Sequence, residues 1–318
     1  MVRVTDEVRR LRRRFAERGE ESQIWDAVQL ARHQDRPYTL DYAQRLFGDF
    51  FELHGDRAFS DDPAIVCGLG CYHGRTVMVI GHQKGRDLQE RSYRNFGMAR
   101  PEGYRKTIRA MELADRLGYP VITLIDTPGA YPGVGAEQRG QAGLIARSLL
   151  AMARLSVPVV AVVIGEGGSG GALAIGLADR VLMQENAIYS VISPEGCAAI
   201  LWKDAGQARK AAAAFRPTAR ACLDLKVIDG VVPEPSGGAH RDHDRAARHL
   251  DAAIRQELAV LDALPPRVRR MARRAKFRAM GVWGVEEPSD ASAEPFLAPV
   301  PAPATGRSVT VSPTPASA

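Results

Sequence analysis

The stretch from Val157 to Gly176 constrains this 318-residue chain more than any other. Its apolar residues through Ile164 predict a fully buried strand. The run Gly-Glu-Gly-Gly-Ser-Gly-Gly that follows is predicted to be a turn almost without side chains. The residues after it predict a short helix with no polar face. Consecutive glycines let a ligand approach main-chain N–H groups without a Cβ in the way, which is how main chain can stabilise an oxyanion. Gly167 and Gly168 are therefore the predicted donors. A close helix–strand crossing that excludes side chains is the alternative.

Two other motifs match the same run. Residues 165–170 fit G-x-G-x-x-G, but the helix that follows is shorter and more apolar than a dinucleotide-binding helix. Residues 167–171 fit G-x-S-x-G, which would make Ser169 a nucleophile, with Asp229 and His240 later in the order of a serine hydrolase. In that fold the first glycine follows the strand directly, whereas two residues intervene here. Both interpretations rank below the oxyanion site.

A second glycine-rich loop runs from Asp126 to Glu137, directly after the predicted strand Val121–Ile125. Its two prolines stiffen it and its glycines keep it open, which suits a preorganised binding wall. Gly129, Ala130 and Tyr131 are its predicted substrate-binding residues. Because neighbouring parallel strands end at one edge of a sheet, the two glycine-rich segments are expected to meet there. The chemistry this favours is stabilisation of an anion, such as an enolate, by main-chain donors.

The remaining pattern predicts an α/β core, since strands alternate with helices. The predicted strands are Ala64–Tyr72, Thr76–Gly81, Val121–Ile125, Val157–Ile164, Arg180–Met183, Ala187–Val191 and Val227–Val232. The predicted helices are residues 6–32, a helix capped by Thr39 that continues through Phe51, Pro101–Leu117, Glu137–Leu155, Pro194–Trp202 capped by Ser193, and His243–Leu264.

The net charge of +6 is concentrated at the ends of the chain. Residues 265–280 hold six Arg and one Lys without an acid, as a helix or arm that either faces solvent or meets nucleic acid or an acidic partner. Residues 285–318 contain seven prolines and are predicted to be disordered. The four cysteines form no zinc pattern, so no metal is expected in this chain. Without a signal peptide or an apolar span, a cytoplasmic location is expected.

Eight segments give the chain a specific resemblance, which extends from about Trp25 to Gly281. They are Arg36–Tyr42, Gly81–Arg86, Asn95–Met98, Pro101–Lys106, Ile125–Glu137, Ile164–Gly176, Tyr189–Cys197 and Pro233–His240. They closely resemble the alpha subunit of bacterial acetyl-CoA carboxylase carboxyltransferase. The resemblance implies a crotonase-like α/β fold of repeated ββα units with flanking helices. The expected organisation is a helical arm over residues 1–35, this domain over 36–284, and the tail over 285–318.

The resemblance also implies a reaction and partners. The enzyme would move a carboxyl group from carboxybiotin, on the biotin carboxyl carrier protein, to acetyl-CoA, forming malonyl-CoA for fatty acid biosynthesis. It would need a separate zinc-ribbon beta subunit, in an alpha2beta2 hetero-oligomer that works with biotin carboxylase. Lys84, Arg86, Arg105 and Lys106 are candidates for contacts with the phosphates of CoA, and surface ion pairs are the alternative.

Two other functions stay open at this stage. One is a serine hydrolase that uses Ser169, and the other is a basic scaffold that binds nucleic acid through its charged ends. Membrane binding is not expected.

Overall fold

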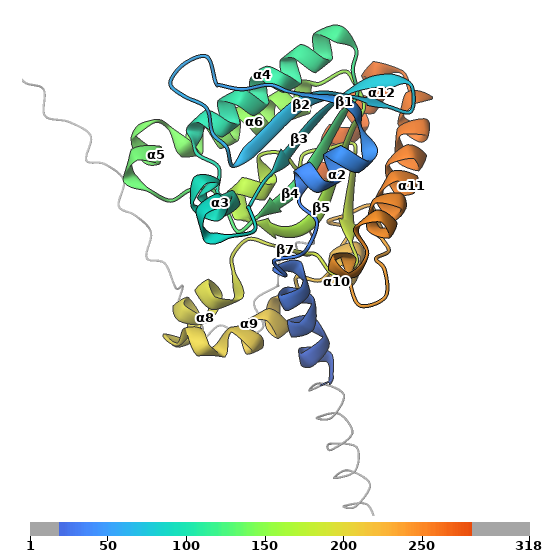
Figure 1. Ribbon diagram of the computed structural model, residues 1–318. Coiled ribbons are helices and arrows are strands. Elements are labelled where there is room, and N and C mark those ends of the chain that lie inside the picture. Colours follow the sequence, from blue (N-terminus) through green and yellow to red (C-terminus); the bar gives the residue numbers. More distant parts are fainter. Residues whose placement is uncertain (1–18, 282–318) are drawn as a thin grey trace, which may run out of the picture. The chain divides into compact units, whose positions relative to one another are not determined.

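The computed structural model describes residues 19–281, which are built around one eight-stranded mixed sheet (Figure 1). The strands are β1 (Gly48–Glu52), β2 (Ile65–Tyr72), β3 (Arg75–His82), β4 (Val121–Thr127), β5 (Val159–Gly168), β6 (Arg180–Gln184), β7 (Ile188–Ser190) and β8 (Gly230–Val232). Their order is β1-β2-β3-β4-β5-β6-β8, with β7 also paired to β5. β1, β2 and β3 are antiparallel, and every pairing from β3 to β8 is parallel. The predicted disordered tail and residues 1–18 of the predicted arm lie outside the described residues.

Helices connect and cover the strands, as the alternating pattern predicts. They are α2 (Thr39–Leu46), α3 (Leu88–Tyr93), α4 (Pro101–Leu117), α5 (Val134–Gln138), α6 (Gln141–Arg154), α7 (Ser169–Leu173), α8 (Pro194–Trp202), α9 (Ala208–Phe215), α10 (Ala219–Asp224), α11 (His243–Asp262) and α12 (Pro266–Arg278). Short 3₁₀ turns are η1 (Asn95–Gly97), η2 (Ala205–Gln207) and η3 (Ala239–Arg241). Residues 19–31 are also helical. None of these helices is both long and apolar enough to cross a membrane, judged over the described part of the chain.

The sheet has a hydrophobic layer on each face because its central strands are apolar at every position. Side chains alternate along a strand, so Val159, Ala161 and Val163 join the layer that α4, α6 and α7 complete. Val160 and Val162 join the opposite layer, which α2 and α11 cover. Figure 1 shows α4 and α6 along one face of the sheet and α11 along the other. A continuous apolar strand is what burial on both faces requires.

Two helices start and end as their sequences predict. α4 has a proline in its first turn and ends at Gly118, which adopts the left-handed conformation (φ 74°) that glycine permits. α8 begins after Ser193, whose side chain accepts a hydrogen bond from the N–H of Gly196 at 3.1 Å.

Two predicted helices are wrong in their limits. The helix predicted through Phe51 ends at Leu46, and Gly48–Glu52 instead pairs with β2 as an edge strand. Its cap is not Thr39, which is buried and donates its hydroxyl to the carbonyl of His82. The helix predicted over Glu137–Leu155 is divided into α5 and α6, because Gly140 between them has a φ of 83°. Tertiary pairing and one left-handed glycine override the local helical pattern.

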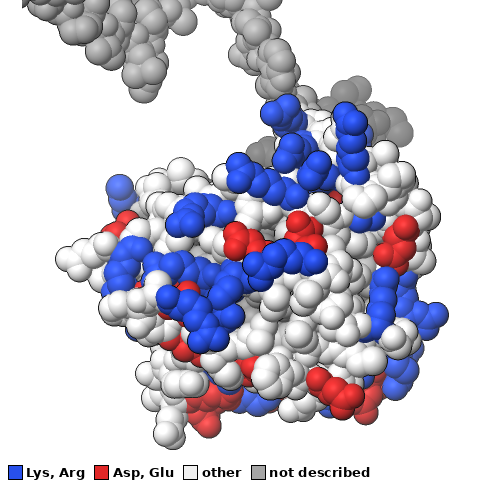
Figure 2. Space-filling view, turned by 90° about the horizontal axis from the view of Figure 1, so that it is seen from above, with Lys and Arg blue, Asp and Glu red and all other residues white. Residues whose placement is uncertain are grey.

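The basic segment 265–280 forms α12, and part of its charge holds the helix on the core. Arg273 is 1% exposed and lies 2.6 Å from Asp179, and the same guanidinium donates to the carbonyl of Val157 at 3.1 Å. Arg269 is also buried and donates to the carbonyl of Leu261 at 2.7 Å. Figure 2 shows Lys and Arg side chains in several groups on one face, with acidic side chains among them. The buried contacts of Arg273 and Arg269 favour a packing role for α12 over a nucleic-acid-binding surface.

Candidate functional site

The glycine-rich run begins as strand rather than as turn. β5 extends to Gly168, beyond the predicted end at Ile164, and Gly167 pairs with Thr127 of β4 on one side and Tyr189 of β7 on the other. α7 starts at the next residue, with Gly168 as its N-cap. The prediction of a free turn from residue 165 onwards is therefore wrong. The glycines end a central strand, and the sheet fixes the direction of their peptide groups from both sides.

Close packing explains two of these glycines. A Cβ on Gly168 would lie 2.2 Å from the carbonyl oxygen of Pro128, and a Cβ on Gly171 would lie 2.7 Å from the carbonyl carbon of Gly129. The alternative of a crossing that excludes side chains is thus realised here. The same contacts bring the loop after β4 against the run after β5, which confirms that the two glycine-rich segments meet at one edge of the sheet.

A chain of five alternating charges lies beside the glycines. Arg32 contacts Glu166 and Glu195, each at 2.7 Å. Lys84 lies 2.6 Å from the other oxygen of Glu166 and 2.7 Å from Asp126. Asp126 in turn accepts the main-chain N–H of Glu166 at 2.9 Å. Three of the five residues come from the carboxyl ends of adjacent strands, β3, β4 and β5, where parallel sheets place their sites.

Burial and ion pairing together set the charges in this chain. Burial would raise the pKa of Glu166, but Lys84 and Arg32 outweigh it and hold the pKa at about 2. Burial would lower the pKa of Lys84, yet the two adjacent carboxylates raise it above its ordinary value. Burial raises the pKa of Asp126, although Lys84 opposes the shift. Glu166 and Lys84 are therefore ionised at neutral pH, as a fixed ion pair directly before Gly167.

Two adjoining cavities open at this edge of the sheet. The larger, about 210 Å³, lies over the ion pair between Lys84 and Glu166. The smaller, about 10 Å³, is lined by Gly167 and Gly168. Both include Arg32, Pro128 and Glu166 in their walls, so they are neighbours. The main chain of the two glycines is thus reached through a narrow space without a side chain of its own in the way.

The predicted binding loop after β4 is held in one conformation. The hydroxyl of Thr127 donates to the carbonyl of Gly129 at 2.7 Å and accepts its N–H at 3.1 Å. The N–H of Tyr131 bonds the carbonyl of Ala99 at 3.0 Å, and its ring lies under the guanidinium of Arg100. Ala130 is half-buried between these anchors. The loop therefore has the preorganised character that its prolines and glycines predict.

The four basic residues considered for phosphate contacts all have acidic partners. Lys84 holds two carboxylates, as described, and Arg86 lies 2.6 Å from Asp41. Arg105 pairs with Asp56 and Glu102, at 2.7 and 3.0 Å. Lys106 is fully buried and lies 2.6 Å from Asp61. These contacts favour the alternative of structural ion pairs, and phosphate binding by these residues stays an untested prediction.

Ser169 has a left-handed backbone (φ 49°), and no general base lies beside it among residues 19–281. It lines an apolar cavity of about 280 Å³, and none of the residues described in that lining is His, Asp or Glu. Asp229 instead holds Lys276 at 2.7 Å, and the ring of His240 stacks on His33 with centroids 3.9 Å apart. A serine nucleophile needs a base within hydrogen-bond reach. The geometry does not support the hydrolase.

Sequence reasoning missed the charge chain. Asp126 and Glu166 did carry a signal, because each is an acid at the end of an otherwise apolar buried strand. Such a group needs a partner when it is buried. Arg32 and Glu195 carried none, since Arg32 meets Glu166 and Glu195 only through the tertiary fold, 134 and 163 residues away in sequence.

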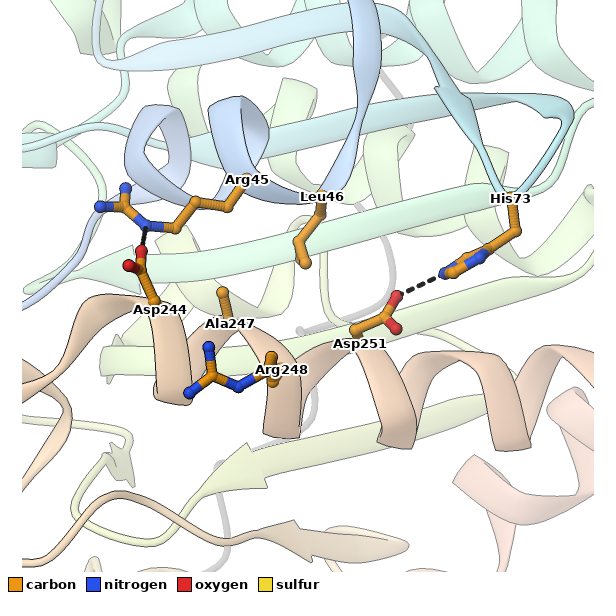
Figure 3. Close-up of a pocket in the computed structure, with 7 residues that line it drawn as sticks. All are labelled: Arg45, Leu46, His73, Asp244, Ala247, Arg248 and Asp251. Atoms are coloured by element: carbon orange, nitrogen blue, oxygen red, sulfur yellow. Dashed lines mark hydrogen bonds and ion pairs between the residues drawn. The ribbon is translucent and has the colours of Figure 1, made fainter.

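The groove in Figure 3 lies elsewhere, between α2 and α11 on the opposite layer of the sheet. Its volume is about 350 Å³. Arg45 faces Asp244 at 2.8 Å and His73 faces Asp251 at 2.7 Å across it. These exposed pairs join the two helices and the β2–β3 hairpin, so we assign the groove a structural role.

The residues between 19 and 281 contain no cluster of three or more His, Cys, Asp or Glu side chains that would hold a metal ion. The four cysteines are free thiols, with Cys67 and Cys222 buried.

Comparison with known proteins identifies the family. Residues 1–281 match the family model described as acetyl co-enzyme A carboxylase carboxyltransferase-like. The alpha subunit of acetyl-coenzyme A carboxylase carboxyl transferase from Thermus thermophilus is 57% identical over 282 residues, 89% of each chain. The chain belongs to this family. The corresponding subunit from Geobacter sulfurreducens is 59% identical over 256 residues, 80% of each chain. The chain is thus a carboxyltransferase alpha subunit of acetyl-CoA carboxylase, and the predicted resemblance is confirmed.

Solved structures confirm the crotonase-like fold class. A transcarboxylase 12S structure with methylmalonyl-coenzyme A and methylmalonic acid bound superimposes with a TM-score of 0.55 and 21% identity. The superimposed region covers 69% of this chain and 41% of the transcarboxylase chain. The beta subunit of P. aeruginosa geranyl-CoA carboxylase gives a TM-score of 0.55 at 19% identity, over 72% and 43% of the two chains. The chain therefore spans less than half the length of either solved protein.

Proposed function

We propose that this alpha subunit takes the carboxyl group from carboxybiotin on a carrier protein and passes it to acetyl-CoA, forming malonyl-CoA in the cytoplasm. It acts together with a zinc-ribbon beta subunit in an alpha2beta2 assembly. Biotin carboxylase carboxylates the biotin on the carrier protein that this assembly uses. The observation that carries the proposal is the small cavity at the end of β5, where Gly167 and Gly168 expose main chain without a Cβ, in a chain 57% identical to an alpha subunit of acetyl-CoA carboxylase. Bound carboxybiotin contributes the carboxyl group itself, and the protein contributes positioning and electrostatics.

The main-chain N–H groups of Gly167 and Gly168 are the proposed donors to a developing oxyanion. Support comes from the small cavity, where no Cβ separates the main chain from a ligand. Donors that are oriented before the reaction lower its barrier without reorganisation.

The ion-pair chain keeps these donors in place. Glu166 is held by Arg32 and Lys84 through its side chain and by Asp126 through its N–H, so the Gly165–Glu166 peptide group, one residue before Gly167, cannot rotate freely. Glu166 is ionised and already saturated by cations, which makes it a positioning residue and not a base. The loop Gly129–Tyr131 follows Pro128, which lines both cavities, and is expected to orient the acyl substrate.

A reconstitution assay tests the proposal. The purified chain is mixed with carboxylated carrier protein and acetyl-CoA, with and without a zinc-ribbon beta subunit, and malonyl-CoA is measured. We expect no turnover from the chain alone, because the chemistry develops charge on two oxygens and this chain has one glycine-built anion site. Addition of the beta subunit should restore turnover and give a stable hetero-oligomer. Full turnover by beta-free protein, or none in the mixture, would contradict the proposal.

A further inference from the structure

Three consecutive residues near the larger cavity adopt left-handed backbone conformations. They are Asn95, Phe96 and Gly97, with φ of 47°, 56° and 77°. Gly97 is required, because a Cβ there would lie 2.8 Å from Cγ of Lys84. The side chain of Asn95 accepts a hydrogen bond from Arg100 at 2.9 Å, which fixes the turn from the other side. Two non-glycine residues in this region cost free energy, and such strain persists mainly where it orients a functional group.

The turn presents an aromatic ring to the cavity of about 210 Å³. Phe96 lines that cavity and is 41% exposed. The guanidinium carbon of Arg91 lies 5.9 Å from the centre of its ring, so cation and ring form one unit. Tyr38 and Pro128 also line the cavity and add a second aromatic and an apolar surface. A compact ring of modest size would contact apolar groups on more than one side.

Arg91 supplies the available positive charge in this cavity. The other two cations that line it, Arg32 and Lys84, are neutralised by buried or half-buried carboxylates. Within residues 19–281, the guanidinium of Arg91 has no carboxylate partner, and it lies over the Phe96 ring. A free guanidinium beside aromatic walls is suited to a carboxylate on a small ring.

We propose that Arg91 and Phe96 form the subsite for the carboxylated ureido ring of carboxybiotin. The Phe96 ring packs against the bicycle, and Arg91 pairs with the carboxylate that it carries. The inference rests on the proposed function and adds two specificity residues to it. The cavity adjoins the one lined by Gly167 and Gly168, so a ring held here lies next to those donors.

The size of the cavity favours the ring over the other substrate. Drug-sized ligands occupy roughly 300–1,000 Å³, so a cavity of about 210 Å³ takes only a compact group. The adenosine phosphates of CoA exceed it. The acetyl group is uncharged and has no use for the Arg91 guanidinium.

Reverse transfer tests the subsite with a free substrate, biocytin, and the assembled alpha–beta enzyme. In this direction the carboxyl group leaves the malonyl carbon of malonyl-CoA and bonds a ureido nitrogen, and the proton from that nitrogen replaces it to give acetyl-CoA. Phe96→Leu should raise KM for biocytin about three- to tenfold, the range for loss of an aromatic contact. Arg91→Gln should lower kcat about tenfold or more, because its partner is the carboxylate that forms. KM for malonyl-CoA should stay unchanged in both.

Matched controls come from the same helix. Arg94 lies over Tyr93, 5.6 Å from its ring centre, and neither residue lines the cavity. Arg94→Gln and Tyr93→Leu should leave both KM values and kcat near wild type. Phe96→Tyr keeps the ring and should restore KM for biocytin. Melting temperatures of all five variants establish that they fold.

A binding measurement supplies a readout independent of turnover. Saturation-transfer NMR of biocytin with the assembled enzyme should show contact with the wild type and with Arg91→Gln, and a weaker signal with Phe96→Leu. Variants that match the controls, or a raised KM for malonyl-CoA instead of biocytin, would overturn the subsite while the proposed function stands. A wild-type complex that forms malonyl-CoA from carboxylated carrier protein but neither carboxylates nor binds biocytin would overturn the subsite alone, and a complex that forms no malonyl-CoA would overturn both.

Discussion

Gly168→Ala is the substitution that most directly probes the end of β5. Gly168 is the last residue of the strand and the N-cap of α7, and it lines the small cavity proposed as the anion site. Its φ of −91° is open to any residue, so an alanine there suffers no backbone strain. The effect of the substitution must therefore come from the added methyl group and from the displacement of the N–H.

The packing around Gly168 sets the size of the effect. The new Cβ would lie 2.2 Å from the carbonyl oxygen of Pro128 and 2.8 Å from that of Thr127, both main-chain atoms. Side-chain rotation cannot relieve such a contact, so the two strand ends must separate by about 0.8 Å to reach 3.0 Å. Overpacking of this kind costs about 1–3 kcal/mol of unfolding free energy. Displacing one oxyanion donor lowers kcat on the order of a hundredfold.

Two control substitutions separate these effects. Gly68→Ala places a Cβ 2.4 Å from the ring of Phe50 and 2.7 Å from the carbonyl of Phe51, a similar clash at the other end of the sheet. It should lower stability without lowering kcat. Gly143→Ala in α6 meets nothing within 4 Å and should raise stability by up to about 1 kcal/mol.

The assay is kcat for malonyl-CoA formation by the reconstituted enzyme, at a temperature where urea denaturation shows each variant to be folded. The reasoning fails if Gly168→Ala retains wild-type kcat, or if Gly68→Ala loses as much rate as Gly168→Ala does. The first result would remove the oxyanion role. The second would show that the lower kcat of Gly168→Ala follows from its loss of stability and not from the displaced donor.

Two further predictions concern the hydrolase alternative and the basic segment. Ser169→Ala should leave carboxyl transfer within a few-fold of wild type, and the wild-type protein should not react with a fluorophosphonate, because no His, Asp or Glu among the described residues lines the cavity at Ser169; labelling of Ser169 in the wild type would support the hydrolase instead. Arg273→Met should lower the unfolding free energy by about 3–5 kcal/mol, since it leaves Asp179 buried without its partner, whereas Met at the exposed Arg267 should change it little; equal effects in denaturant titrations would refute the packing role of α12.

The position of the site could be predicted from local patterns. Val121–Ile125 and Val157–Ile164 are apolar at nearly every position, and only strands buried on both faces have that composition. Each is followed by a glycine-rich segment, so the edge of the sheet that holds the candidate site could be predicted without any long-range information. The structure confirms that β4 and β5 are neighbours.

The limits of the elements could not be predicted in the same way. Glycine has low strand propensity, so Gly165 to Gly168 were predicted as turn, yet pairing with β4 and β7 extends the strand through them. Gly48–Glu52 follows a helical pattern and becomes a strand because β2 offers it an edge. In both cases the deciding hydrogen bonds join residues distant in sequence, and no window of neighbouring residues contains them.

The same reason explains why charge was harder to interpret than hydrophobicity. An apolar residue is satisfied by any apolar neighbour, so its periodicity alone predicts which face it buries. A buried charge needs one partner in one geometry, and that partner is set by topology. Lys84 was predicted as a phosphate ligand because the sequence does not show that the fold places Asp126 and Glu166 on either side of its ammonium group. By the same argument, Arg91 is a candidate ligand-binding residue. The fold leaves its guanidinium in a cavity beside Phe96, and no acid among the described residues pairs with it.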